Sequence, residues 1–240
     1  MKYFTKEWFA DTILAAMCFQ IKKSAKAGKF SEKYYLSLYK DQKKWFVKNE
    51  KFIAKHNKVK FDLAAAEAAF EANYNENLEY VKANLPENIL ARVADVRVLA
   101  LGSAESDIVD DITRFCGQVN ARCERLADTY KEELATLGES LGWEKLNTCT
   151  NLLNSAIELC EWNGNNFAFA TSAEYTDVPC RVDLIDAKVN VCDEGLVGSA
   201  VAAFELLPAE NGGFTFSALC QKLDGTLIEF SAEAQGLEVI

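Results

Sequence analysis

Three aspartates lie close together near the middle of the chain: Asp107, Asp110 and Asp111, with Glu105 just before them. Clustered carboxylates can share a proton or bind a divalent cation, so this group could serve a carboxylate-dependent hydrolase. Such an enzyme would hold the carboxylates in a cleft and raise the pKa of at least one of them. The alternative is a solvated acidic first turn, because the N-terminus of a helix favours negative charge.

Lysines are concentrated in residues 31–60, where they alternate with aromatic residues such as Tyr34, Tyr39 and Trp45. These lysines are Lys33, Lys40, Lys43, Lys44, Lys48, Lys51, Lys55, Lys58 and Lys60. Five of them form the candidate binding surface: Lys40, Lys43, Lys44, Lys48 and Lys51. Ammonium groups can contact phosphates while aromatic rings stack on bases, which favours nucleic-acid binding. However, residues 1–60 contain no arginine, the side chain most used to read bases.

Other catalytic chemistry has little support in the sequence. His56 is the only histidine, and no serine or cysteine motif lies near it to act as a nucleophile. The eight cysteines include no Cys-x-x-Cys pair and no cluster with zinc-ligand spacing. We therefore expect no catalytic residues, no metal and no cofactor, and we expect the thiols to be reduced in the cytoplasm.

The charge is distributed unevenly along the 240 residues, whose net charge is −10. Residues 1–60 hold 15 lysines and 5 acids, a net charge of +10, whereas residues 61–240 carry a net charge of −20. This asymmetry suits the steering of a charged partner, although basic and acidic helices of one molecule could also pair with each other. No apolar run reaches the length of about 18 residues that a membrane span needs, so we expect no membrane association.

The elements that must position these residues begin with helices. Capping residues predict helix starts at Thr5, Ser31 and Asp62, and Pro86 predicts a fourth. The fourth helix is expected to end at Gly102 in a left-handed conformation, with residues 96–101 as an alternative buried strand. A fifth helix follows Ser103 as its N-cap and runs through residue 137, and a sixth covers residues 143–160.

Beyond residue 163 the apolar period changes from about 3.6 to 2, which indicates strands. We expect strands at residues 167–169, 182–192, 200–207, 214–223, 226–230 and 237–240. The dipeptide Asp224-Gly225 predicts a two-residue hairpin turn in which both residues have positive φ. The sequence therefore predicts an α+β protein with about six N-terminal helices and a C-terminal antiparallel meander. The expected domains are residues 1–162 and 163–240, which could pack as one unit.

Three segments resemble a family of uncharacterised bacterial proteins that share a domain of unknown function. They are the opening Met-Lys-Tyr-Phe-Thr-Lys-Glu-Trp at residues 1–8, the corner at residues 95–102, and the C-terminal segments around Asp186-Ala187 and residues 213–240. In the similar sequences a histidine often precedes the Asp-Ala pair, and Ile185 stands in that place here. The resemblance implies a bacterial origin and no particular activity.

These observations favour a non-catalytic cytoplasmic protein that binds another protein. Nucleic-acid binding through residues 31–60 is the first alternative, and a carboxylate-dependent hydrolase is the second. The direction of the lysine side chains distinguishes the possibilities. A continuous basic face favours an acidic partner or a polyanion, whereas lysines paired to acids of later helices favour a purely architectural role.

Overall fold

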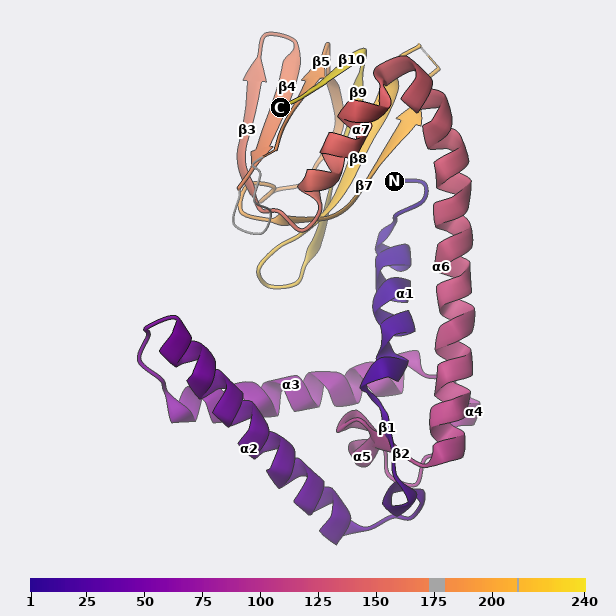
Figure 1. Cartoon of the computed structure of the whole chain (residues 1–240), viewed down its shortest axis with the longest axis vertical. Coiled ribbons are helices and arrows are strands. Elements are labelled where there is room, and N and C mark those ends of the chain that lie inside the picture. The colour runs from indigo at the N-terminus through magenta and orange to yellow at the C-terminus, as the bar shows by residue number, and fades with distance from the viewer. Residues whose placement is uncertain (173–179, 211) are drawn as a thin grey trace. The chain divides into compact units, whose positions relative to one another are not determined.

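The computed structural model describes residues 1–172, 180–210 and 212–240, and the chain forms two compact units (Figure 1). The helical unit comprises Thr12–Asn120. The sandwich unit joins Met1–Asp11 to Ala121–Ile240. Two helices, α1 (Lys6–Ala16) and α6 (Ser106–Leu141), contribute residues to both units.

The described residues contain seven α-helices, concentrated toward the N-terminus, followed by antiparallel sheets, so the predicted α+β class is confirmed. The sequence predicts a boundary between residues 162 and 163, whereas the two units meet after Asp11 and after Asn120. The physical reason lies in the core of the sandwich unit, where Leu137, Leu146 and Leu152 pack with the strands. Residues of helical segments therefore belong to the same core as the sheets.

The helical unit is built largely from a hairpin of two long helices, α2 (Glu32–His56) and α3 (Leu63–Asn84) (Figure 1). The predicted caps are confirmed, because the Ser31 side chain accepts a hydrogen bond from Tyr34 N and that of Asp62 accepts one from Ala65 N. The elements of this unit between α1 and α6 are η1 (Met17–Gln20), β1 (Lys22–Lys23), η2 (Ala25–Gly28), α2 (Glu32–His56), α3 (Leu63–Asn84), α4 (Glu87–Leu90), α5 (Val96–Ala100) and β2 (Ser103–Ala104).

The predicted fourth helix is interrupted, which corrects the expectation of one continuous helix from Pro86. Two short helices, α4 and α5, take its place, with Asp95 as the N-cap of α5. The Asp95 carboxylate accepts a hydrogen bond from Arg97 N and is buried. A capping side chain inside an apolar run thus restarts the helix, although the apolar spacing continues through the break.

The corner at Gly102 has the predicted left-handed conformation, with φ of +69°. The sequence predicts Ser103 as the N-cap of the next helix, and this prediction is wrong. Ser103 lies in β2, which pairs in parallel with β1. The long helix α6 begins only at Ser106. The core of this unit lies between α1, α3, the corner and α6, with Leu99, Ile112 and Cys116 almost completely buried.

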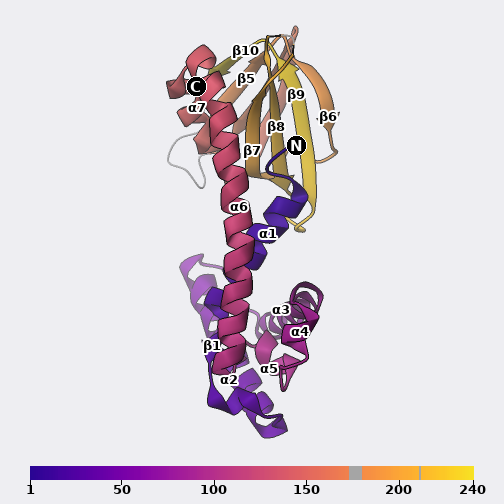
Figure 2. The same ribbon diagram turned by 90° about the vertical axis from the view of Figure 1, so that its right-hand side faces the viewer.

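Two four-stranded antiparallel sheets form the sandwich unit. One has the order β10-β5-β4-β3, and the other has the order β6-β9-β8-β7, visible in Figure 2. After α7 (Trp143–Cys149) and η3 (Thr150–Leu152), the strands are β3 (Ile157–Asn163), β4 (Asn166–Thr171), β5 (Arg181–Ile185), β6 (Lys188–Cys192), β7 (Ala200–Pro208), β8 (Phe214–Gln221), β9 (Leu227–Ala234) and β10 (Gly236–Val239).

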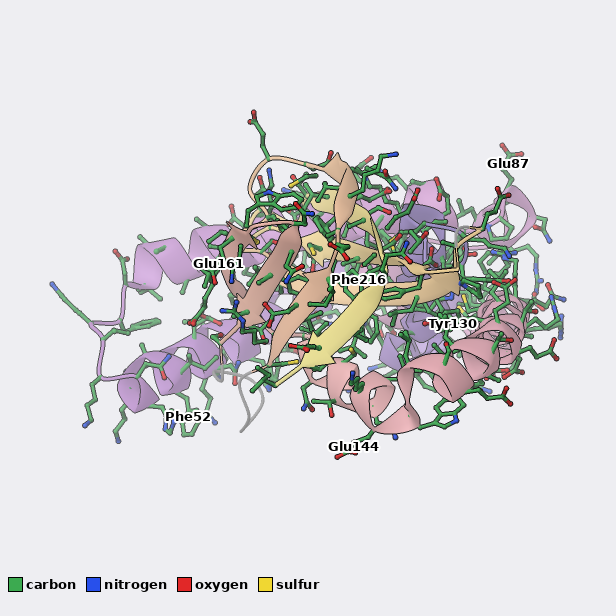
Figure 3. The ribbon with its side chains drawn as sticks, turned by 90° about the horizontal axis from the view of Figure 1, so that it is seen from above. Phe52, Glu87, Tyr130, Glu144, Glu161 and Phe216 are labelled. Carbon is green, nitrogen blue, oxygen red and sulfur yellow. The ribbon has the colours of Figure 1, made fainter. Side chains whose placement is uncertain are left out.

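The inner faces of the sheets meet through aromatic rings. Phe167 of β4 stacks on Phe230 of β9 with ring centroids 4.9 Å apart, and Phe169 lies 5.2 Å from Phe216. Phe216, labelled in Figure 3, is completely buried. Buried and partly exposed residues alternate along β5 and β9, whereas β8 is buried at almost every position, so both of its faces are covered.

Three predictions for this region are wrong in detail. The sixth helix ends at Cys149 rather than residue 160, because the chain from Ile157 pairs with β4. The expected strand at residues 182–192 is two strands in different sheets, divided at Asp186, whose φ is +50°. In the turn at Asp224-Gly225 only Gly225 has positive φ, and Lys222 N donates to Thr226 O, a hairpin loop one residue longer than predicted.

The first residues of the chain are attached to the sandwich unit through a buried carboxylate. Glu205 of β7 is 1% exposed and accepts hydrogen bonds from the backbone N–H groups of Lys2, Tyr3 and Phe4. The Tyr3 hydroxyl donates to Glu133 of α6 at 2.7 Å. The opening segment that carries the family resemblance therefore serves packing and hydrogen bonding.

Candidate functional site

Six lysines of α2 form one continuous exposed row, which we call the basic stripe. Successive members are 7, 4, 4, 3 and 4 residues apart, so they lie along one side of the helix. All six are exposed, and within the described part of the chain none has an ion-pair partner. The members are Lys33, Lys40, Lys44, Lys48, Lys51 and Lys55.

Lys43, one of the five candidate lysines, does not belong to the stripe. Its ammonium group lies 3.3 Å from a carboxylate oxygen of Glu67 and 3.2 Å from one of Glu71, both on α3. The hydrogen bond to Glu71 is the main reason that the pKa of Lys43 is raised. The structure thus brings together four of the five candidate lysines, adds Lys33 and Lys55, and assigns Lys43 to the contact between α2 and α3.

The opposite side of α2 is fixed by packing, which determines where the stripe points. Tyr39 makes an edge-to-face contact with Phe70 of α3, with ring centroids 5.1 Å apart. The Arg97 guanidinium lies 4.2 Å from the Tyr35 ring centroid, and its hydrogen bonds to Asp95, followed by those to Glu32, raise the pKa of Arg97. Because these contacts occupy the other face, the lysine side remains free for a partner.

Two large aromatic residues border the stripe. Trp45 and Phe52 are seven residues apart, each directly follows a stripe lysine, and they are 68% and 69% exposed. Phe52 projects from α2 in Figure 3. Aromatic side chains are frequent anchors in protein interfaces. An edge of exposed rings beside a row of cations therefore suits a partner that carries both acidic and apolar side chains.

A groove of about 650 Å³ lies next to this edge, between α2 and the Gly102 corner. Leu38, Gln42 and Trp45 line it on the α2 side. The Gln42 side chain donates to the carbonyl oxygen of Leu101, and the Tyr34 hydroxyl forms hydrogen bonds with Ser24 and Ser103. These bonds hold the two walls together within the helical unit, so the groove is a formed feature that could receive an apolar side chain.

The three aspartates of the second alternative lie on the first turns of α6, and each is paired with a cation. Arg92 donates to both Asp107 and Asp111, while Lys23 Nζ is 2.6 Å from Asp110. The hydrogen bond from Arg92 lowers the pKa of Asp111, which keeps this carboxyl ionised. The arrangement is an ion-pair network in which each of the three carboxylates is paired with a cation.

Other residues that could carry chemistry are dispersed. His56 is exposed at the end of α2. Within residues 1–172, 180–210 and 212–240, no group of three or more metal-ligating side chains comes together. No helix of the described chain has the length and apolarity required to cross a bilayer.

The part of the site that sequence reasoning missed is the selection among the lysines. The spacing of Lys33 and Lys55 relative to Lys40, Lys44 and Lys51 places all of them on one helical face, and this signal was available. The partner of Lys43 depends on how α3 folds back, which spacing alone does not give. In comparisons with known proteins, the chain matches no protein-family model, no curated protein and no solved structure.

Proposed function

We propose that this protein is a non-catalytic cytoplasmic binding protein, and that the basic stripe of α2 holds an acidic segment of another protein. The observation that carries the proposal is the set of six exposed lysines on one face of one helix, for which the described residues provide no ion-pair partner. We also propose that the chain belongs to the family of uncharacterised bacterial proteins that it resembles. The opening eight residues are the most specific part of this resemblance.

The stripe has the dimensions of a peptide-binding surface. From Lys33 to Lys55 it extends about 33 Å at the rise of an α-helix. An extended acidic segment of about ten residues has the same length. Exposed ion pairs contribute only about 0.2–1 kcal/mol each, so the charges mainly guide the encounter and set the orientation. Apolar contacts with Trp45 and the adjacent groove would then supply most of the affinity.

The exposed rings favour a protein over a nucleic acid. Their large apolar surfaces match the anchors of protein interfaces, and α2 contains no arginine for base recognition. Nucleic-acid binding is therefore an outcome that the experiment must distinguish.

The experiment measures binding of two fluorescent probes by anisotropy at about 150 mM salt. One probe is a peptide in which glutamates alternate with leucines, and the other is a single-stranded oligonucleotide. Reversing three stripe charges, with Lys44→Glu, Lys48→Glu and Lys51→Glu, should weaken peptide binding by about tenfold or more. The matched control reverses three exposed lysines outside α2, with Lys26→Glu, Lys29→Glu and Lys60→Glu, and should leave binding nearly unchanged.

Three results would contradict the proposal. The first is absence of peptide binding by the unaltered protein, and the second is an equal loss in the stripe variant and its control. The third is tighter binding of the oligonucleotide than of the peptide, with a steep fall in affinity as salt increases. That result would establish the nucleic-acid alternative instead.

A further inference from the structure

The sandwich unit contains a cavity that the proposed function does not use. Its volume is about 360 Å³, and it lies between α1, α6, α7 and β7. Aromatic rings from these elements form much of its wall: Trp8, Tyr130, Trp143 and Phe204. Among the described residues that line it, none carries a charge, and the polar amide and aliphatic hydroxyl groups come from Asn147 and Thr150.

The cavity exists because small side chains face large ones. Ala127 of α6 and the neighbouring Ala202 and Ala203 of β7 form part of its lining. The register of β7 against β8 shifts between Val201 and Ala203, so a bulge places consecutive alanines at this position. Larger residues at any of these three positions would fill the space.

The aromatic walls are held in place by contacts within the sandwich unit. The Tyr130 hydroxyl, on α6 in Figure 3, accepts a hydrogen bond of 3.0 Å from Leu206 N. Phe4 packs against Tyr130 with ring centroids 4.8 Å apart, and against Trp8 at 4.7 Å. A site whose walls are fixed before binding loses less conformational entropy when a ligand enters.

The chemistry of the lining selects the class of ligand. The volume lies within the range of about 300–1,000 Å³ that small-molecule sites have. A charged ligand would lose its hydration without gaining a counter-charge, whereas an apolar ligand would gain contact with the rings. The polar groups of Asn147 and Thr150 lie at one part of this otherwise apolar lining, and neither supplies a counter-charge.

From these observations, we infer that the cavity binds a small neutral apolar molecule, a ring system or an alkyl chain. The site is lined by Trp8, Tyr130, Trp143 and the alanines of β7, all within the sandwich unit. It is independent of the basic stripe.

The test uses N-phenyl-1-naphthylamine, a neutral dye whose fluorescence rises in an apolar site. We expect one dye molecule per chain and displacement by decan-1-ol, with decanoate at least about tenfold weaker because its carboxylate finds no partner. Ala127→Leu should weaken dye binding by about tenfold or more by filling the cavity. Ala135→Leu, the same change at an exposed position of α6, is the control and should bind the dye normally.

A second filling variant, Ala202→Leu, decides the matter if Ala127→Leu fails to show a cooperative thermal transition. Dye binding that survives in a folded filling variant would overturn the inference, as would absence of dye binding to the unaltered protein. Equal displacement by decanoate and decan-1-ol would contradict the neutral ligand class. The triple lysine variant should bind the dye normally, so this test and that of the proposed function can fail separately.

Discussion

The carboxylate of Glu205, in the middle of β7, accepts a hydrogen bond of 2.9 Å from the backbone N–H of Tyr3. The same carboxylate also receives the N–H groups of Lys2 and Phe4. A buried carboxylate that accepts several N–H groups is stabilised in place of its lost hydration. This relationship joins two segments that are distant in the sequence and explains a use for the opening residues that does not involve catalysis.

Replacing Glu205 with glutamine should destabilise the sandwich unit by about 2–3 kcal/mol, because charge-assisted bonds are lost and the new amide hydrogens face backbone donors. Urea unfolding followed by circular dichroism measures the change. Glu238→Gln alters an exposed glutamate of the same unit and should change the stability by less than about 0.5 kcal/mol. Equal effects of the two changes would show that the Glu205 contacts contribute little.

Gly102→Ala should destabilise the helical unit by more than about 1 kcal/mol. The left-handed φ disfavours a side chain, and an added Cβ would lie 2.7 Å from the carbonyl oxygen of Gln20. Gly117→Ala is the opposite case, because Gly117 lies inside α6 with open space around it, and it should stabilise by about 0.5–1 kcal/mol. A thermal or urea melt of both variants checks the prediction, which a neutral Gly102→Ala would refute.

Lys43 and Lys44 are neighbours in the sequence but should respond differently to replacement by alanine. Lys43→Ala removes the pairs with Glu67 and Glu71 and should lower the stability slightly, with little effect on the binding of the acidic peptide. Lys44→Ala should weaken peptide binding and leave the unfolding free energy within about 0.5 kcal/mol. Urea unfolding and anisotropy measurements on both variants check this prediction. Weaker peptide binding by the Lys43 variant, with unchanged binding by the Lys44 variant, would contradict it.

The sandwich unit should lose stability at alkaline pH. Burial raises the pKa of Cys149 and of Cys220 to about 12, and that of Tyr130 also to about 12. Unfolded thiols and phenols ionise near about 8.5 and 10, so folding favours the protonated forms. The corresponding stability is complete below pH of about 8.5 and is lost as the pH rises toward 12, at about 1.4 kcal/mol per pH unit for each ionising group.

Urea titrations of the sandwich unit's unfolding at several pH values between about 8 and 10.5 measure this slope. Cys149→Ala should flatten it, since one of the groups whose pKa is raised by burial is removed. Cys192→Ala removes an exposed thiol and should leave the slope unchanged. A pH dependence that is identical in both variants would mean that the burial of Cys149 is not the cause.

The sequence was most informative where local chemistry decides the structure. The caps at Ser31 and Asp62 and the left-handed Gly102 depend on nearby residues, and all three were predicted correctly. Asp95 shows where this approach fails, since its capping role competes with an apolar pattern that continues through the break. The apolar spacing predicts a single helix because it does not reveal the capping hydrogen bond that the Asp95 side chain makes.

Non-local pairing accounts for the remaining errors. Leu146, Cys149 and Leu153 have helical spacing, yet the chain beyond Asn154, whose φ is +62°, pairs as β3 with β4. Similarly, only the fold places Ala127 of α6 beside Ala202 of β7, so the cavity has no signature in the sequence. Helical spacing is sufficient to predict which lysines share the face of the basic stripe. It does not predict that Lys43 pairs with α3, which only the structure shows.

The sandwich unit consists of two segments separated by the entire helical unit, and this has a consequence for synthesis. During translation, Tyr3 and Phe4 are made well before their partners Glu205 and Tyr130, and contact them only after the intervening chain has been made. The helical unit can therefore fold on the ribosome before the sandwich unit is complete. Until α6 and β7 have been made, Tyr3 and Phe4 lack the partners against which they pack.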